Sequence, residues 1–329
     1  MTSQVRVGIA GTGSYVPERV VPNSHFEKYL DTSDEWITQR TGIKARRWAN
    51  AGEATSDMAL AAARKALEAA ELEPEDLDLV LCGTLTPDHL LPGCSTRIQR
   101  ELGATRAGAF DLNAACTGFL SALNTGEAFV RAGRARRVLA IGAETLSRWI
   151  DPQDRGSCIL FGDGAGAAVL SPFEECQQGE ILKTTLGADG SGYELIHMIG
   201  GGSLNPPTHA SLDRGEHFIR VQGREVYRFA VERMGALIEE LAQGHAQDEI
   251  CLVVPHQVNL RIIDSALERL GWDREKVVVN IQDYGNTSAA SVPVALDEAV
   301  RAGRAVPGKL VILAAFGAGL TWGGALIRW

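Results

Sequence analysis

The sequence lacks any run of apolar residues approaching the roughly 18 to 20 that a membrane-spanning helix requires. It also lacks the cationic segment, long apolar segment and small-residue cleavage site of a secretory signal, since residues 5–10 form only a short apolar stretch that predicts a strand. We therefore expect neither a membrane protein nor a secreted one, and we predict a cytoplasmic location.

Closely spaced cysteine pairs are also missing. The six cysteines, at positions 82, 94, 116, 158, 176 and 251, form no C-x-x-C motif. A chain of 329 residues is far longer than the small domains that disulfides hold together. We expect reduced thiols and no metal site.

An excess of positive charge is absent. The 32 lysines and arginines are outnumbered by 41 aspartates and glutamates, which gives a formal net charge of −9. This balance argues against an extended surface for nucleic acid or an anionic membrane. An acidic partner would therefore need a local basic patch.

Several common catalytic and nucleotide-binding motifs are missing. There is no G-x-S-x-G, H-E-x-x-H or G-x-x-x-x-G-K-[ST] pattern, which excludes the usual serine hydrolase, zinc protease and P-loop classes. Residues 11–16 (GTGSYV) follow a predicted strand, but Val16 stands where the dinucleotide-binding fingerprint needs its third glycine. A Rossmann-type cofactor site is not expected.

What the sequence does contain is an alternation of short β-branched runs with alanine-rich helical stretches. Apolar residues make up 45% of the chain, and the 36 glycines and 12 prolines are scattered, as in globular proteins. Strands are predicted at residues 77–82, 110–112, 137–141, 167–170, 252–254, 277–281 and 310–313. The pattern indicates an α/β fold.

The two parts of the chain resemble each other. Residues 128–135 (AFVRAGRA) match residues 298–305 (EAVRAGRA) at an offset of 170, and the helical runs 116–132 and 286–302 correspond. A helix at 56–70 leading to a strand likewise corresponds to a helix at 228–242, at an offset of about 173. Chance likeness of alanine-rich helices is the alternative. We predict duplicated halves, residues 1–174 and 175–329, packed as a pseudo-dimer.

Three residues are candidates for catalysis. The offset of 170 places Cys116 opposite Asn286, each opening a helix, where the helix dipole would favour a nucleophilic thiolate. His256 follows a predicted strand, where sites in α/β sheets gather. A neutral imidazole and an amide can both donate hydrogen bonds to an oxyanion, so the set suggests enolate stabilisation. Each residue could instead be structural, and the papain-like order of Cys, His and Asn lacks that family's context around Cys116.

With these residues the sequence resembles the β-ketoacyl-[acyl-carrier-protein] synthase III family along its whole length. The stretches that carry the resemblance are residues 11–17 (GTGSYVP), 31–37 (DTSDEWI), 40–43 (RTGI), 114–116 (AAC), 154–156 (DRG), 161–169 (FGDGAGAAV), 255–261 (PHQVNLR), 285–291 (GNTSAAS) and 316–323 (FGAGLTWG). The resemblance implies a thiolase-like α-β-α-β-α fold of two pseudo-symmetric halves, and a homodimer.

The resemblance also implies a reaction. Cys116 would take an acyl group from acyl-CoA, and His256 and Asn286 would bind the malonyl thioester oxygen of malonyl-acyl-carrier-protein as CO2 leaves. The backbone N–H groups of Cys116 and Ala318 would form an oxyanion hole. The product is a 3-ketoacyl-carrier-protein at the start of fatty acid synthesis. No cofactor is expected, because the CoA thioester is a substrate.

Binding residues follow from the same resemblance. Those matching the CoA site are Trp36, Arg40, Thr41, Arg155, Gly223, Asn259 and Arg261, with Trp36 and Arg155 sandwiching the adenine. Without the resemblance, ordinary surface packing would explain the exposed Trp and Arg. Those expected to dock the acidic carrier protein are Arg228, Arg261 and Arg269, beside a Glu268 that departs from a doubly basic pattern.

The acyl pocket is expected to involve Leu91, Leu146 and Phe316. Leu91 stands where acetyl-primed relatives place a Phe that closes the pocket across the dimer, so we expect acyl groups longer than acetyl to fit. A related acyl-transferring or condensing enzyme of a specialised-metabolite pathway is one alternative. A non-catalytic carrier-protein-binding or dimerisation module is another.

Overall fold

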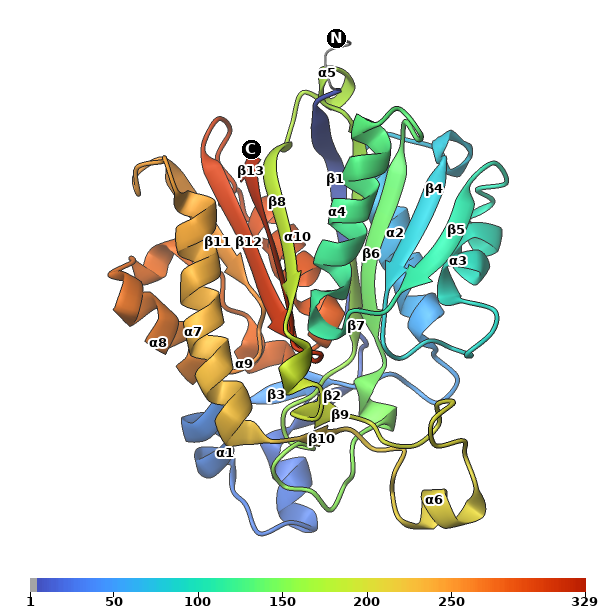
Figure 1. Cartoon of the computed structure of the whole chain (residues 1–329), viewed down its shortest axis with the longest axis vertical. Coiled ribbons are helices and arrows are strands. Elements are labelled where there is room, and N and C mark those ends of the chain that lie inside the picture. The colour runs from blue at the N-terminus through green and yellow to red at the C-terminus, as the bar shows by residue number, and fades with distance from the viewer. Residues whose placement is uncertain (1–4) are drawn as a thin grey trace.

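Two β-sheets form the framework of the protein in the computed structural model, which describes residues 5–329 (Figure 1). In spatial order, sheet one contains β1 (Val7–Tyr15), β7 (Gly164–Pro172), β6 (Val138–Glu144), β4 (Leu79–Gly83) and β5 (Gly108–Leu112). Sheet two contains β8 (Glu180–Ala188), β13 (Thr321–Arg328), β12 (Leu310–Gly317) and β11 (Ile250–Pro255). Because the equivalent strands follow in the same order and with the same directions, the sheets show the predicted duplication.

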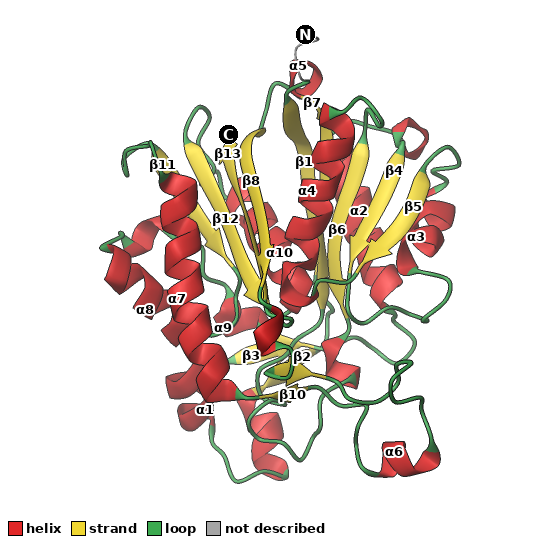
Figure 2. Cartoon of the chain, viewed as in Figure 1, coloured by secondary structure: helices red, strands yellow, loops and turns green. Residues whose placement is uncertain are grey.

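Helices occupy the space between the sheets and cover their outer faces (Figure 2). The helices in the middle layer are α4 (Gly118–Arg131) and α10 (Ser291–Arg301). Those covering sheet one are α2 (Thr55–Ala69) and α3 (Cys94–Leu102), and those covering sheet two are α7 (Gly223–Ala242) and α8 (Leu260–Leu270). The five layers confirm the predicted thiolase-like α-β-α-β-α architecture.

Burial on both faces explains why the strands read as continuous apolar runs. In β4, Leu79 and Leu81 pack into the core between the sheets, whereas Val80 and Cys82 pack into the core beneath α2 and α3. A strand covered on both sides carries no polar alternation. This arrangement is what made the strands visible in the sequence.

Shorter elements gather at one end of the sheets, near the ends of β6 and β12 (Figure 1). The helices and strands concerned are α1 (Asp34–Thr41), α6 (His209–Asp213), α9 (Ile281–Tyr284), β2 (Val20–Pro22), β3 (Ala45–Arg47), β9 (Ile196–His197) and β10 (Arg220–Val221). The 3-10 turns of the chain are Asn23–Lys28, Pro74–Asp76, Ala115–Thr117, Leu146–Arg148, Gly190–Gly192, Arg274–Lys276 and Ser288–Ala290. None of the helices in residues 5–329 combines the length and apolar character needed to cross a membrane.

The predicted strand at 277–281 is wrong. Only Val277 forms a bridge, to Val253, and Ile281 already begins α9. The side chain of Gln257 explains the early end of pairing, since it donates to the carbonyl of Val278 and accepts from the N–H of Asn280. These backbone groups are therefore not available for a longer ladder.

The predicted alignment of Cys116 with Asn286 is also wrong, by three residues. The turns that precede α4 and α10 each contain a residue with positive φ, Ala115 at 47° and Ser288 at 48°, so Cys116 corresponds to Ala289. The offset of 170 holds only at the helix ends, because α4 has 14 residues and α10 has 11.

The predicted boundary between residues 174 and 175 falls in α5 (Phe173–Cys176), between the last strand of sheet one and β8. As a division into domains it stays a prediction.

Candidate active site

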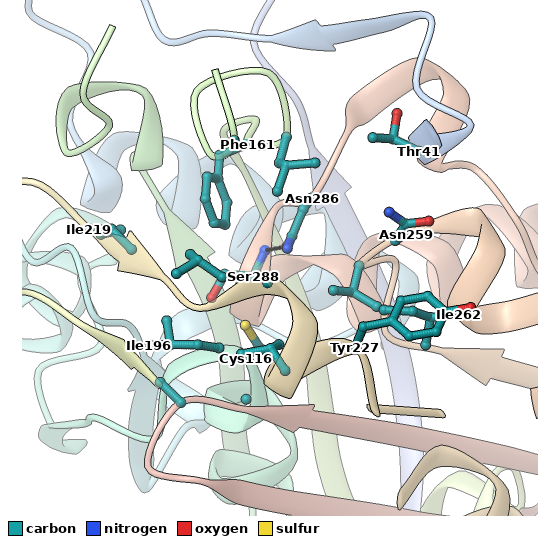
Figure 3. Close-up of a pocket in the computed structure, with 18 of the residues that line it drawn as sticks. Thr41, Cys116, Phe161, Ile196, Ile219, Tyr227, Asn259, Ile262, Asn286 and Ser288 are labelled. Atoms are coloured by element: carbon teal, nitrogen blue, oxygen red, sulfur yellow. Dashed lines mark hydrogen bonds between the residues drawn. The ribbon is translucent and has the colours of Figure 1, made fainter. Parts of the chain in front are cut away.

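A cavity of about 280 Å³ lies where the two sheets meet the shorter elements, and Cys116, His256 and Asn286 all line it. Cys116 belongs to the turn before α4, His256 follows β11, and Asn286 precedes the turn before α10. Figure 3 shows Cys116, Asn286 and Ser288 close together, with Thr41 and Asn259 further along the cavity. Three side chains that are distant in sequence are thus brought to one place.

The backbone around Cys116 is closely packed against β12. A Cβ atom on Gly317 would lie 2.8 Å from the Cys116 nitrogen, which is closer than real Cβ contacts come. Glycine at 317 therefore permits the close approach of the two backbones. Ala318, the next residue, lines the cavity together with Cys116.

Burial dominates the acidity of the Cys116 thiol. Desolvation raises its pKa to about 12, and a hydrogen bond with Ser288 opposes this change only partly. The prediction that the helix dipole favours a thiolate is therefore wrong for the ligand-free protein. Cys116 lies half-buried in the turn before α4, and its raised pKa means that the thiol carries its proton.

His256 is fully buried, and its ring is fixed by two neighbours. Its Nδ1 lies 2.6 Å from the Ser291 hydroxyl oxygen, and its ring meets the Phe316 ring edge-on at 5.7 Å. Burial lowers the pKa of His256 to about 3, so the ring is neutral. Among residues 5–329 its Nε2 has no hydrogen-bond partner. If Nδ1 accepts from Ser291, Nε2 carries the proton and can donate into the cavity.

Asn286 is held by hydrogen bonds on its backbone and its side chain. Its N–H donates to the carbonyl of Leu160 at 2.8 Å, and its own carbonyl accepts from the N–H of Gly162 at 3.0 Å. Its Oδ1 accepts from the N–H of Ser288 at 2.8 Å. Because the oxygen is engaged, the amide nitrogen is the group left to donate. The cavity thus holds a thiol beside two neutral hydrogen-bond donors.

Six of the residues predicted to bind CoA line the same cavity, namely Trp36, Arg40, Thr41, Arg155, Gly223 and Asn259. The Arg155 guanidinium lies 4.7 Å from the centre of the Trp36 ring, which leaves no space for an adenine between them. Asn259 caps α8 by accepting from the N–H of Arg261, and the Thr41 hydroxyl donates to the carbonyl of Ile37. Both polar side chains therefore also have structural partners.

Two of the residues predicted to bind CoA or the acyl group lie outside the cavity. Arg261 is exposed at the start of α8, and Leu91 is 87% exposed beside Leu90, in a loop between β4 and α3. The resemblance assigned Leu91 to the pocket of a partner subunit, so its role stays a prediction. Leu146 and Phe316 do line the cavity.

The residues predicted to dock a carrier protein are exposed on two adjacent helices. Arg228 lies on α7, and Arg261 and Arg269 lie on α8, which packs against α7. In the described part of the chain, none of the three forms a recorded ion pair. They are available to an acidic partner, but their role stays a prediction.

Sequence reasoning missed much of the cavity wall and two polar groups behind it. The missed apolar lining includes Leu85, Ile159, Leu160, Phe161, Ile196, Ile219, Val221, Val226 and Ile262. The missed polar groups are Ser288, which lines the cavity, and the fully buried Glu144 at the end of β6. A carboxylate directly after an apolar strand was a signal that could have identified Glu144.

The five-layered fold and a cavity that joins a thiol, an imidazole and an amide define the class: a thiolase-like condensing enzyme, which is an acyltransferase. Two models of the 3-oxoacyl-[acyl-carrier-protein] synthase III family match residues 110–190 and 241–329, the second being its C-terminal part. The chain belongs to this family, as its resemblance in sequence predicted.

Full-length relatives agree with this assignment. The chain is 48% identical over 331 residues to β-ketoacyl-[acyl-carrier-protein] synthase III of Caldanaerobacter subterraneus, covering 100% of this chain and 99% of the relative. The solved structure of the Aquifex aeolicus synthase III has 45% identity and a TM-score of 0.89, covering 98% and 100% of the two chains. The priming β-ketosynthase of the R1128 polyketide pathway has 38% identity and a TM-score of 0.90, covering 100% and 98%.

Proposed function

We propose that the cavity condenses an acyl group from acyl-CoA with malonyl-acyl-carrier-protein and gives 3-ketoacyl-carrier-protein, CoA and CO2. The observation that carries the proposal is the meeting of Cys116 with His256 and Asn286 in one buried cavity. This step initiates fatty acid synthesis.

In the first half-reaction, the Cys116 sulfur attacks the thioester carbon of acyl-CoA and forms an acyl-cysteine as CoA leaves. The developing oxyanion is stabilised by the backbone N–H groups of Cys116 and Ala318, which lies beside it in the cavity. A covalent intermediate divides one difficult step into two easier ones, and ping-pong kinetics follow.

In the second half-reaction, His256 Nε2 and the Asn286 amide donate to the thioester oxygen of the malonyl group. Loss of CO2 leaves an enolate on that oxygen, and two fixed donors on buried residues stabilise it. The neutral state of His256 suits this role, since the ring donates without releasing its proton. The enolate carbon then attacks the acyl-cysteine and releases the Cys116 sulfur. The proposed steps require no resident cofactor.

The apolar wall of the cavity supports an acyl substrate, and the residues at its mouth support CoA. Trp36, Arg40 and Arg155 form a cationic and aromatic cluster there, in which Arg40 lies 5.6 Å from the Trp36 ring. An adenine would stack on Trp36 after Arg155 moves aside. Leu91 in the partner's pocket would leave room for acyl chains longer than acetyl.

The chain acts as a homodimer in this proposal. Leu90 and Leu91 are almost fully exposed, and Phe110 is partly exposed on β5 at the edge of sheet one. A second copy would cover these apolar side chains. Arg228, Arg261 and Arg269 remain the proposed docking site for an acidic carrier protein.

A second candidate function keeps the chemistry but changes the pathway. The 38% identity to a polyketide priming ketosynthase favours a specialised-metabolite route as the alternative. The decisive experiment mixes acyl-enzyme with malonyl-acyl-carrier-protein of fatty acid synthesis and measures CO2 and 3-ketoacyl product. Stoichiometric CO2 and product support initiation. If neither forms while the acyl-cysteine persists, the proposed function is wrong.

A further inference from the structure

Glu144 is a buried carboxyl group that the proposed reaction has not used. It ends β6 and is fully buried. Its oxygens accept from the Thr86 hydroxyl at 2.5 Å, and from the Leu85 N–H and the Thr84 hydroxyl at 3.3 Å. Its fourth neighbour is the Ser288 hydroxyl at 3.2 Å. In the described part of the chain it has no ion pair with a cation.

Only one of these neighbours can exchange a proton between Glu144 and the cavity. The Leu85 N–H can only donate. The Thr84 and Thr86 hydroxyls already accept from the N–H groups of Thr86 and Thr145. Ser288 lines the cavity close to Cys116 (Figure 3), and its hydroxyl is a group that lowers the pKa of the Cys116 thiol.

The backbone directs the Ser288 side chain to this position. Its φ of 48° lies in the left-handed region, which non-glycine residues occupy at an energetic cost. The same turn holds Asn286 Oδ1 through the Ser288 N–H. Ser288 is therefore placed between Cys116 and Glu144 by a strained and well-fixed turn.

We propose that Glu144 is the proton acceptor for Cys116 during acylation and that Ser288 relays the proton. This inference rests on the proposed function of the cavity. As the Cys116 sulfur forms its bond to the thioester carbon, its proton passes to the Ser288 oxygen, and the Ser288 hydroxyl proton passes to the Glu144 carboxylate.

The proton balance closes within each half-reaction. When the bond between the acyl carbon and the CoA sulfur breaks, the CoA thiolate takes the proton back from Glu144 through Ser288. Free CoA and a neutral acyl-cysteine result. In the condensation, the released Cys116 thiolate is reprotonated by the same route, and Glu144 draws from solvent the one proton that the decarboxylative reaction consumes.

The acidity of the groups is consistent with this order of events. Burial raises the pKa of Glu144 to about 7, while the pKa of Cys116 is about 12, so the thiol keeps its proton until the carbon–sulfur bond forms. Cys82 on β4 also faces Glu144, and burial raises its pKa well above its ordinary value. Across the cavity, His256 titrates far below neutrality. The acylation rate should therefore rise with pH through about 7, as Glu144 loses its proton.

The test measures single-turnover acylation of Cys116 by acyl-CoA between pH 5.5 and 9. Glu144→Gln keeps the shape of the side chain but cannot accept the proton, so we expect a loss of about 10²-fold and no rise through pH 7. Asp163→Asn is a matched control. Asp163 is also buried and accepts from Ser147, but it lies outside the cavity. It should change stability without changing the pH profile.

Ser288→Ala keeps Glu144 and breaks the relay, and it should reproduce the slow, pH-independent acylation. Compared with Glu144→Gln, the Glu144→Asp variant should regain part of the acylation rate and the inflection in its pH profile. If both Glu144→Gln and Ser288→Ala fold and acylate like wild type, the relay is wrong although the proposed function stands. If wild-type protein forms no acyl-cysteine at all, the proposed function itself fails.

Discussion

The turns that open α4 and α10 have the same backbone but carry different chemistry. Each contains a residue near φ 48°, which is Ala115 in the first turn and Ser288 in the second. The residue after it is the cavity-lining Cys116 in the first turn and the buried Ala289 in the second. Duplication thus preserved the turn and its strain, whereas the side chains diverged.

This difference shows how a two-fold repeat can build an asymmetric site. In our account the first turn supplies the nucleophile, and the second supplies groups that act on it or on the second substrate, namely Ser288 and the nearby Asn286. In the second turn, Ser288 serves acylation whereas the nearby Asn286 serves the condensation, so substitutions at these two residues should be separable by measuring each half-reaction alone.

Loss of the nucleophile should have the largest effect. Cys116→Ala removes the only group proposed to form the acyl intermediate, so acyl-CoA should leave no adduct and the condensation should stop. Intact-protein mass spectrometry is the measurement. A wild-type level of adduct on the variant would show that another residue is the nucleophile. The claim that the first turn supplies it would then be wrong.

Asn286→Ala should leave acylation near the wild-type rate but slow CO2 release from malonyl-carrier-protein by about 10² to 10³-fold, because one of two donors to the enolate is lost. Separate assays of CoA release and CO2 release measure the two steps. Equal slowing of both would show that the second turn also serves the first half-reaction through this side chain.

Gly317→Ala should displace the Cys116 backbone, since the new Cβ would lie 2.8 Å from the Cys116 nitrogen. A displacement of about 1 Å can cost about 10²-fold in rate, and we expect that loss in acylation. Gly126→Ala in α4 is the control. Its Cβ would meet Leu170 and Val138 at 2.9 Å. It should lower the free energy of unfolding by about 1 to 3 kcal/mol without slowing acylation in the folded protein.

Ser291→Ala should have the smallest effect, about tenfold or less on CO2 release, because it removes one hydrogen bond to the His256 ring. The ring has a pKa lowered to about 3, so CO2 release should show no inflection near pH 6.5. Nitrogen NMR of the wild-type imidazole should find a neutral ring protonated on Nε2 at pH 6. A ring protonated on Nδ1 would contradict the proposed donor.

Much of the fold could be predicted from the sequence. The sheets are covered on both faces, so their strands are continuous apolar runs, and the sequence repeat indicates the duplicated halves. The strand at 277–281 failed because a side chain, Gln257, takes the backbone hydrogen bonds of Val278 and Asn280. The alignment of Cys116 with Asn286 failed because α10 begins three residues later relative to the repeat.

Less of the site than of the fold could be predicted from the sequence. Motifs identified Cys116, His256 and Asn286, but the acidity of the thiol depends on burial, which the helix-dipole argument did not include. Glu144 and Ser288 come from segments that are 144 residues apart and meet only in the fold. No local pattern joins them.

The most direct test of the account exposes the purified protein to acyl-CoAs from acetyl to dodecanoyl and identifies the modified residue by mass spectrometry. The account predicts one acyl group on Cys116, with fastest loading by a chain longer than acetyl. Loading by acetyl-CoA alone would contradict the argument from Leu91. Folded protein that forms no adduct with any acyl-CoA would contradict the central claim that Cys116 is a CoA-primed nucleophile.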